Sequence, residues 1–244
     1  MFEILINIFN ALLYKPLFNS LVLLYNYAPG HDFGISIILL TLIIRIIIYP
    51  LSVKAISSQK TLQKVQPKIQ EIQKKYKDDK EKQAKEILEV YKTEKVNPFS
   101  GLFLAIIQLP ILIALYKVFW QGLDPKELIN LYNFILNPVQ INAVFLGIID
   151  LSKANMIIAI LAGIVQFYQT KMLMPPKSQS VASKSPDFSQ MMQMQMTYFF
   201  PILTVIILLG LPSALGLYWT TSGIFSIIQQ HFILKNPQTE KVKN

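Results

Sequence analysis

A single arginine, Arg45, lies inside a long apolar run that carries no other charge between Phe33 and Pro50. At roughly 1.5 Å per helical residue, this run with its flanks is long enough to cross a hydrocarbon layer of about 30 Å. A charge within a bilayer costs at least about 2.5–3.5 kcal/mol on insertion scales, so such a residue usually faces protein, water or a partner. Arg45 could snorkel to the nearer membrane surface. No acidic residue lies in any predicted span, and we therefore favour a hydrated cavity open to the cytosol.

Other polar residues occur at helical spacing within the apolar segments. Thr41, Arg45 and Tyr49 are four residues apart and are predicted to share one face of a helix. The same reasoning selects Gln108 in the middle of the second predicted span and the pair Gln166 and Thr170 in the third. In the last span it selects a stripe of residues on one face, which are Trp219, Ser222, Gly223, Ser226 and Gln230. The candidate lining residues are Arg45, Thr41, Gln108, Gln166, Trp219 and Ser226. The simpler interpretation, which we favour for Gln108 and Ser226, is a hydrogen bond between helices, worth about 0.6 kcal/mol on average.

Covalent chemistry is not indicated by the sequence. It has no cysteine, and its two histidines, His31 and His231, lie far apart in no metal-binding motif. Phosphate-binding loops, dinucleotide-binding turns and nucleophile elbows are also absent from the sequence. We therefore expect neither an enzyme nor a cofactor or metal.

Apolar runs alternate with a few polar blocks along the 244 residues, which are 52% hydrophobic with a formal net charge of +9. This clustering predicts an all-α polytopic membrane protein with five transmembrane helices. The expected spans are about 34–51, 99–120, 153–171, 192–209 and 214–233, within a core of residues 33–233. Residues 1–32 are interpreted as an amphipathic segment at the outer interface rather than a sixth span, because polar residues such as Asn7, Asn10 and Lys15 interrupt them.

The polar block 52–97 carries twelve lysines and seven acidic residues, a net charge of +5. Apolar residues at 3-4 spacing, from Leu62 to Tyr76, predict one helix, and a capping box at Asp78 and Glu81 predicts the start of a second. We expect a helical hairpin, which either holds the topology or acts as a mobile docking element. Short interfacial helices are expected in 121–152, a flexible connection in 175–189 and a basic tail in 234–244.

Membrane topology follows from the lysine distribution. Lysine-rich loops remain in the cytoplasm, so the hairpin, the 175–189 connection and the tail are predicted to be inside. The amino terminus and residues 121–152 are then outside.

Several motifs occur in order along nearly the whole chain. They are Ile38–Arg45 with Tyr49-Pro50-Leu51, Gln66-Pro67-Lys68-Ile69-Gln70, Lys74-Lys75-Tyr76, Asn97-Pro98-Phe99, Gln108-Leu109-Pro110-Ile111, Phe145-Leu146-Gly147, Asp150-Leu151, Gln166-Phe167-Tyr168-Gln169 and Gly216-Leu217-Tyr218-Trp219. Together they resemble the YidC/Oxa/Alb family of membrane protein insertases, in a minimal five-span form.

This resemblance implies a bacterial plasma-membrane protein with a positively charged groove open to cytosol and lipid. It places Arg45, Gln166 and Trp219 at the family's groove positions. Nascent membrane proteins and the lipid bilayer are the implied partners, and the Sec translocon, the ribosome and the signal-recognition-particle pathway are candidates. Basic surfaces also bind anionic lipid headgroups, which is a competing use of the lysines. The alternative function is a small channel or transporter subunit.

Overall fold

A computed structural model describes residues 2–97, 100–173 and 194–235, and the regular elements of this part of the chain are helices, apart from one short β-hairpin. The elements in order are α1 (Phe2–Phe9), the π-helical turn η1 (Asn10–Tyr14), α2 (Lys15–Tyr27), the 3-10 turn η2 (Pro29–His31), α3 (Phe33–Ile47), α4 (Tyr49–Lys75), α5 (Lys80–Thr93), α6 (Ser100–Gln121), the 3-10 helix η3 (Pro125–Asn130), β1 (Val144–Phe145), β2 (Ile149–Asp150), α7 (Met156–Met172), the π-helical turn η4 (Gln195–Phe199), α9 (Phe200–Leu208) and α10 (Ser213–Lys235). The helical class expected from the apolar runs is confirmed.

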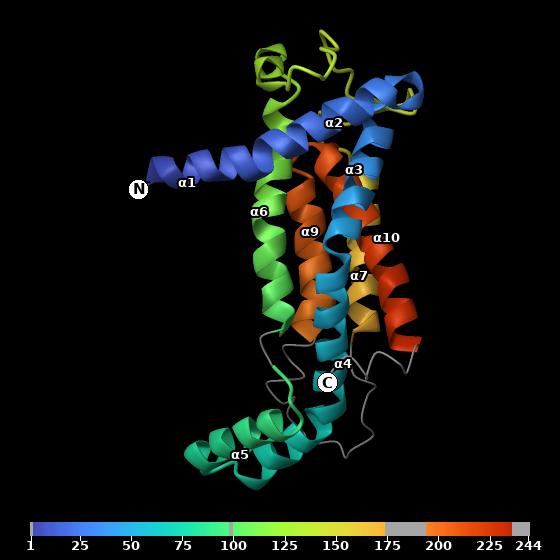
Figure 1. The fold of residues 1–244 in the computed structure, drawn as a ribbon. Coiled ribbons are helices and arrows are strands. Elements are labelled where there is room, and N and C mark those ends of the chain that lie inside the picture. The colour runs from blue at the N-terminus through green and yellow to red at the C-terminus, as the bar shows by residue number, and fades with distance from the viewer. Residues whose placement is uncertain (1, 98–99, 174–193, 236–244) are drawn as a thin grey trace.

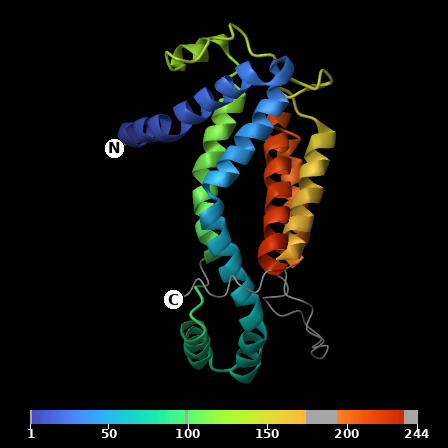
Figure 2. The same cartoon turned by 45° about the vertical axis from the view of Figure 1, so that its right-hand side comes forward.

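A bundle of helices forms the centre of the molecule, with α10 in contact with α3, α4, α6, α7 and α9 (Figures 1 and 2). Small residues permit the closest approaches. A Cβ added at Gly163 of α7 would lie 2.4 Å from Val205 of α9, and one at Gly216 of α10 would lie 2.7 Å from Ile158 of α7. Close backbone approach at small residues is the usual packing of membrane helices, where burial from water supplies little of the driving force.

The helix of the first predicted span ends before the predicted end of that span. We placed its end at residue 51, whereas α3 ends at Ile47 and the chain bends by 66° into α4. Pro50 explains the bend, because proline lacks the backbone N–H that a helix interior needs and is favoured in a helix's first turn. Tyr49 therefore begins a new helix and does not continue the face of Thr41 and Arg45.

α4 extends beyond the bundle and turns back through α5, forming the expected hairpin (Figure 1). Val65 and Ile69 of the predicted seam are buried. The second helix is capped by Asp79, whose carboxylate accepts the Lys82 N–H at 3.0 Å, so the capping box placed at Asp78 is wrong. Asp79 is the residue directly before the first helical one, which is where a side-chain cap must lie.

α4 also binds the ends of two bundle helices. The ammonium of Lys60 donates to the Leu234 carbonyl in the last turn of α10 at 3.0 Å, and the Gln63 amide donates to the carbonyl of Leu173, which follows α7. Carbonyls at helix ends lack partners within the helix, so these contacts satisfy them. The hairpin is thereby tied to the bundle near its base.

The helix α2 lies across the opposite end of the bundle, and α1, which is continuous with α2 through η1, extends away from the bundle (Figures 1 and 2). The buried Asn19 of α2 connects it to the neighbouring loop, accepting the Tyr132 N–H at 2.6 Å and donating to the Asn130 carbonyl at 3.1 Å. Glu3–Tyr27 is the one continuous helix among the described residues long and apolar enough to cross a membrane. The bent pair α3–α4 passes the same test jointly. The count of five spans therefore stays a prediction.

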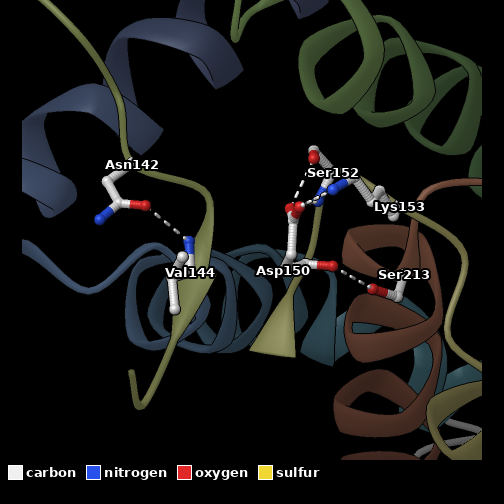
Figure 3. Close-up of polar contacts among 6 residues, drawn as sticks. All are labelled: Asn142, Val144, Asp150, Ser152, Lys153 and Ser213. Carbon is white, nitrogen blue, oxygen red and sulfur yellow. Dashed lines mark hydrogen bonds and ion pairs between the residues drawn. The ribbon is translucent and has the colours of Figure 1, made fainter. Parts of the chain in front are cut away.

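Residues 121–152 differ from the interfacial helices that we predicted. They contain one 3-10 helix, η3, and the antiparallel pair β1–β2, in which Val144 faces Asp150. Figure 3 shows the hairpin beside the start of α10, where the Ser213 hydroxyl donates to the Asp150 carbonyl at 3.4 Å. Hydrogen bonds from Ser152 and the ammonium of Lys153 hold the pKa of the Asp150 carboxyl below its usual range. A loop built from such local polar bonds leaves no helical periodicity in the sequence.

The connection 175–189 lies outside the described residues, as does the tail beyond Lys235.

Candidate functional site

Arg45 lies near the end of α3, half-buried, with its guanidinium against α10. Its Nε donates to the Ser222 hydroxyl oxygen at 2.7 Å, and Nη2 binds the same oxygen. The ion pairs among the described residues are Lys68–Glu94 and Lys153–Asp150, so no carboxylate in this part of the chain neutralises Arg45. The cation is positioned by a neutral hydroxyl and keeps its charge.

A second polar contact joins α6 to α10 beside the first. The Gln108 amide donates to the Tyr218 hydroxyl, and that hydroxyl also interacts with Ser222 and with the charge of Arg45. Tyr218 and Ser222 are four residues apart and so lie on one face of α10. Three helices, α3, α6 and α10, thus contribute to one continuous polar cluster.

The pair Gln166 and Trp219 forms a third contact, between α7 and α10. The indole Nε1 donates to the Gln166 side-chain oxygen at 3.1 Å, and both residues are half-buried. The sequence selected these two residues independently, and the structure brings them together.

Thr41 and Ser226 are buried, and their hydroxyls bond within their own helices. The Thr41 hydroxyl donates to the Ile37 carbonyl at 2.6 Å and that of Ser226 to the Ser222 carbonyl at 3.0 Å. Tyr49 lies beyond the bend and is 42% exposed. Of the predicted site residues, Arg45, Gln108, Gln166 and Trp219 therefore make side-chain hydrogen bonds to another helix of the described chain, whereas the hydroxyls of Thr41 and Ser226 bond within their own helices.

Ser222 and Tyr218 were not among the six selected residues. Ser222 belonged to the polar stripe of the last span, and Tyr218 to the Gly216–Trp219 motif, so the signal was present but did not identify their partners. Lys117, inside the second predicted span, was also overlooked. Asking of every charged residue in a predicted span whether an acidic residue can pair with it, as was asked of Arg45, would have identified Lys117.

One further feature could bind a ligand. A cavity of about 530 Å³ lies near the β-hairpin, lined by residues that include Gln140, Asn142 and Asp150. Within the described part of the chain no group of three or more histidine, cysteine, aspartate or glutamate residues could hold a metal ion. The polar cluster around Arg45 is a site inside the bundle where a cation is held by neutral groups and by no described carboxylate.

Comparison with known proteins yields one consistent family. The family described as 60Kd inner membrane protein matches residues 23–241. A protein of Geobacter metallireducens named membrane protein insertase YidC is 34% identical over 235 residues, which cover 96% of this chain and 39% of that protein. A protein of the same name from Fusobacterium nucleatum is 35% identical over 204 residues, covering 84% of this chain and 87% of its relative. The chain thus spans about two fifths of the Geobacter protein and most of the Fusobacterium one.

Proposed function

The chain belongs to the 60Kd inner membrane protein family, and from this premise we propose that it is a membrane protein insertase of a bacterial inner membrane. The observation that carries the proposal is the position of Arg45. Its guanidinium is held within the bundle by Ser222, and no described carboxylate neutralises it.

Arg45 and its neighbours would line a hydrated groove open to cytosol and lipid. The positive charge attracts acidic residues of a client's translocating segment, and amide and hydroxyl groups of Gln108, Gln166 and Ser222 offer hydrogen bonds to its backbone. The apolar segment of the client then leaves sideways into lipid, favoured by about 25 cal/mol per Å² of apolar surface removed from water. No bond is made or broken in this process.

The membrane orientation in this proposal puts α1 and α2 at the outer interface and the α4–α5 hairpin in the cytosol. Nascent membrane proteins and lipid are the partners it requires. Because the hairpin has a net charge of +5, we propose it as the candidate surface for binding the ribosome, the signal-recognition-particle pathway or the Sec translocon.

Reconstitution into liposomes tests this function directly. The client is a short single-span protein made with either acidic or neutral residues in its translocated segment. We expect Arg45→Ala to lower insertion of the acidic client by about fivefold or more, because an exposed ion pair contributes up to about 1 kcal/mol and a partly desolvated pair contributes more. Arg45→Lys should retain much of the activity, because a diffuse positive potential needs no planar guanidinium.

A matched control is Lys54→Ala, which removes one exposed cation of α4 without touching the polar cluster. Full activity of Arg45→Ala on the acidic client would contradict the groove mechanism. Ion flux across client-free liposomes, with no insertion, would instead support the channel or transporter alternative.

A further inference from the structure

Lys117 is a second cation within a bundle helix, at the other end of the molecule from the hairpin. It is half-buried near the end of α6, where α6 meets the π-helical turn η1. Its ammonium donates to the Asn10 side-chain oxygen at 3.0 Å and lies 4.2 Å from the centre of the Tyr14 ring. Figures 1 and 2 show α1 leaving the bundle beside α6 at this level.

An acidic side chain of this region, that of Glu127, already accepts hydrogen bonds from other groups. Glu127 accepts the Tyr14 hydroxyl at 2.6 Å and the Asn130 amide at 3.0 Å. Burial and this bond to Glu127 raise the pKa of Tyr14, so its hydroxyl stays a donor to Glu127. Within the described residues Lys117 therefore forms no ion pair, and Asn10 supplies one acceptor for an ammonium that has three N–H donors.

An exposed apolar stripe of α6 runs along the bundle to this lysine. Counted together with Lys117, its members recur at spacings of three and four residues, which places them on the same face of α6 as Lys117. They are Ile106, Leu109, Ile113 and Trp120, each more than half exposed. Trp120 also stacks on Tyr116, with ring centroids 5.7 Å apart, as in the aromatic belts of membrane interfaces.

We propose that Lys117 binds the phosphate of an anionic phospholipid in the leaflet that contains α1. The ammonium supplies the charge, the Asn10 side chain and Tyr14 ring fix its position, and the stripe from Ile106 to Ile113 contacts an acyl chain. An apolar surface continuous with the cation distinguishes a lipid from a free phosphate ion, which would need polar donors instead. The proposal rests on the membrane location proposed above, but it requires no client and no charge at Arg45.

The two tryptophans, Trp120 and Trp219, allow a direct measurement. Trp219→Phe leaves Trp120, three residues from Lys117, as the single tryptophan of the full chain, which is excited selectively at wavelengths that tyrosine does not absorb. The protein is reconstituted in phosphatidylcholine with increasing fractions of brominated phosphatidylglycerol or brominated phosphatidylcholine, and quenching of Trp120 gives their relative binding constant. We expect phosphatidylglycerol to be favoured about fivefold, the effect of one basic residue near the membrane surface.

Lys117→Met should reduce this preference to about one, and Lys117→Arg should keep it. Lys15→Met is the matched control, because Lys15 is an exposed cation directly after η1, and it should change the ratio less than twofold. If the circular dichroism of Lys117→Met shows a loss of helix, Lys117→Gln replaces it, because it removes the same charge. The ratio of the binding constants of phosphatidylglycerol and phosphatidylcholine is then measured in that variant.

No preference in the parent, or an equal preference in the Lys117→Met variant, would overturn the proposal. Loss of the preference on adding millimolar glycerol 3-phosphate would assign the site to free phosphate and overturn the lipid assignment. Because no client is present, neither result depends on whether the chain inserts proteins.

Discussion

Ser222 determines where the charge of Arg45 is held. Two nitrogens of the Arg45 guanidinium bind the Ser222 hydroxyl, and the Tyr218 hydroxyl also interacts with the side chain of Ser222. A carboxylate at this position would neutralise the arginine and remove the positive potential. A serine orients the cation and leaves it unneutralised, as the proposed groove mechanism requires.

Ser222→Ala should therefore destabilise the protein and weaken the effect of Arg45. Hydrogen bonds between membrane helices contribute about 0.6 kcal/mol on average and up to about 1.7, and we expect a loss in this range. Unfolding in mixed micelles measures it, and insertion of the acidic client should fall while that of the neutral client changes little. Thr220→Ala is the control, because the Thr220 hydroxyl bonds only to the Gly216 carbonyl of its own helix. Equal losses of stability and of acidic-client insertion in Ser222→Ala and Thr220→Ala would show that Ser222 has no special role in positioning Arg45.

At the scale of elements, α7 and α9 approach each other closely at Gly163. A Cβ there would meet Val205 Cγ2 at 2.4 Å and the Pro201 carbonyl oxygen at 3.2 Å. The backbone carbonyl cannot move without displacing α9, so the helix pair must separate to admit even one methyl group.

Gly163→Ala should lower the free energy of unfolding by about 1–3 kcal/mol, the usual cost of overpacking. Gly210→Ala is a matched control, since its Cβ would meet the Ile207 carbonyl oxygen at an ordinary 3.6 Å. Unfolding of both variants in mixed micelles compares them. Stability of Gly163→Ala equal to that of the parent would show that the two helices do not pack as described.

How much could be predicted from sequence differs between elements for physical reasons. Apolar periodicity located the bundle helices and the hairpin, and it placed Gln166 and Trp219 on faces that do meet. The bend after Ile47 was missed, although Pro50 signals it, because the apolar composition continues across it. The contacts of Ser222 and Tyr218 depend on which helices are neighbours, and spacing within one helix cannot supply that.

For the whole molecule, the family match at residues 23–241 confirms the resemblance drawn from motifs. The motifs are informative together because they occur in one order along the chain, whereas each by itself would fit many apolar helices. Orientation in the membrane depends on a different property, the distribution of lysines between the two ends of the bundle.

Cysteine labelling tests this orientation in the intact cell. The chain has no cysteine, so Lys77→Cys and Gln140→Cys each introduce a single exposed thiol, in the hairpin turn and in the loop at the other end. A membrane-impermeant maleimide should label position 140 in whole cells and position 77 only after lysis, because lysine-rich segments remain in the cytoplasm. The two variants control for each other, since reagent access and thiol reactivity are tested at both ends. Labelling of position 77 in unbroken cells would contradict the predicted orientation, because it would place the hairpin turn outside the cytoplasm and remove the hairpin as a candidate surface for cytosolic partners.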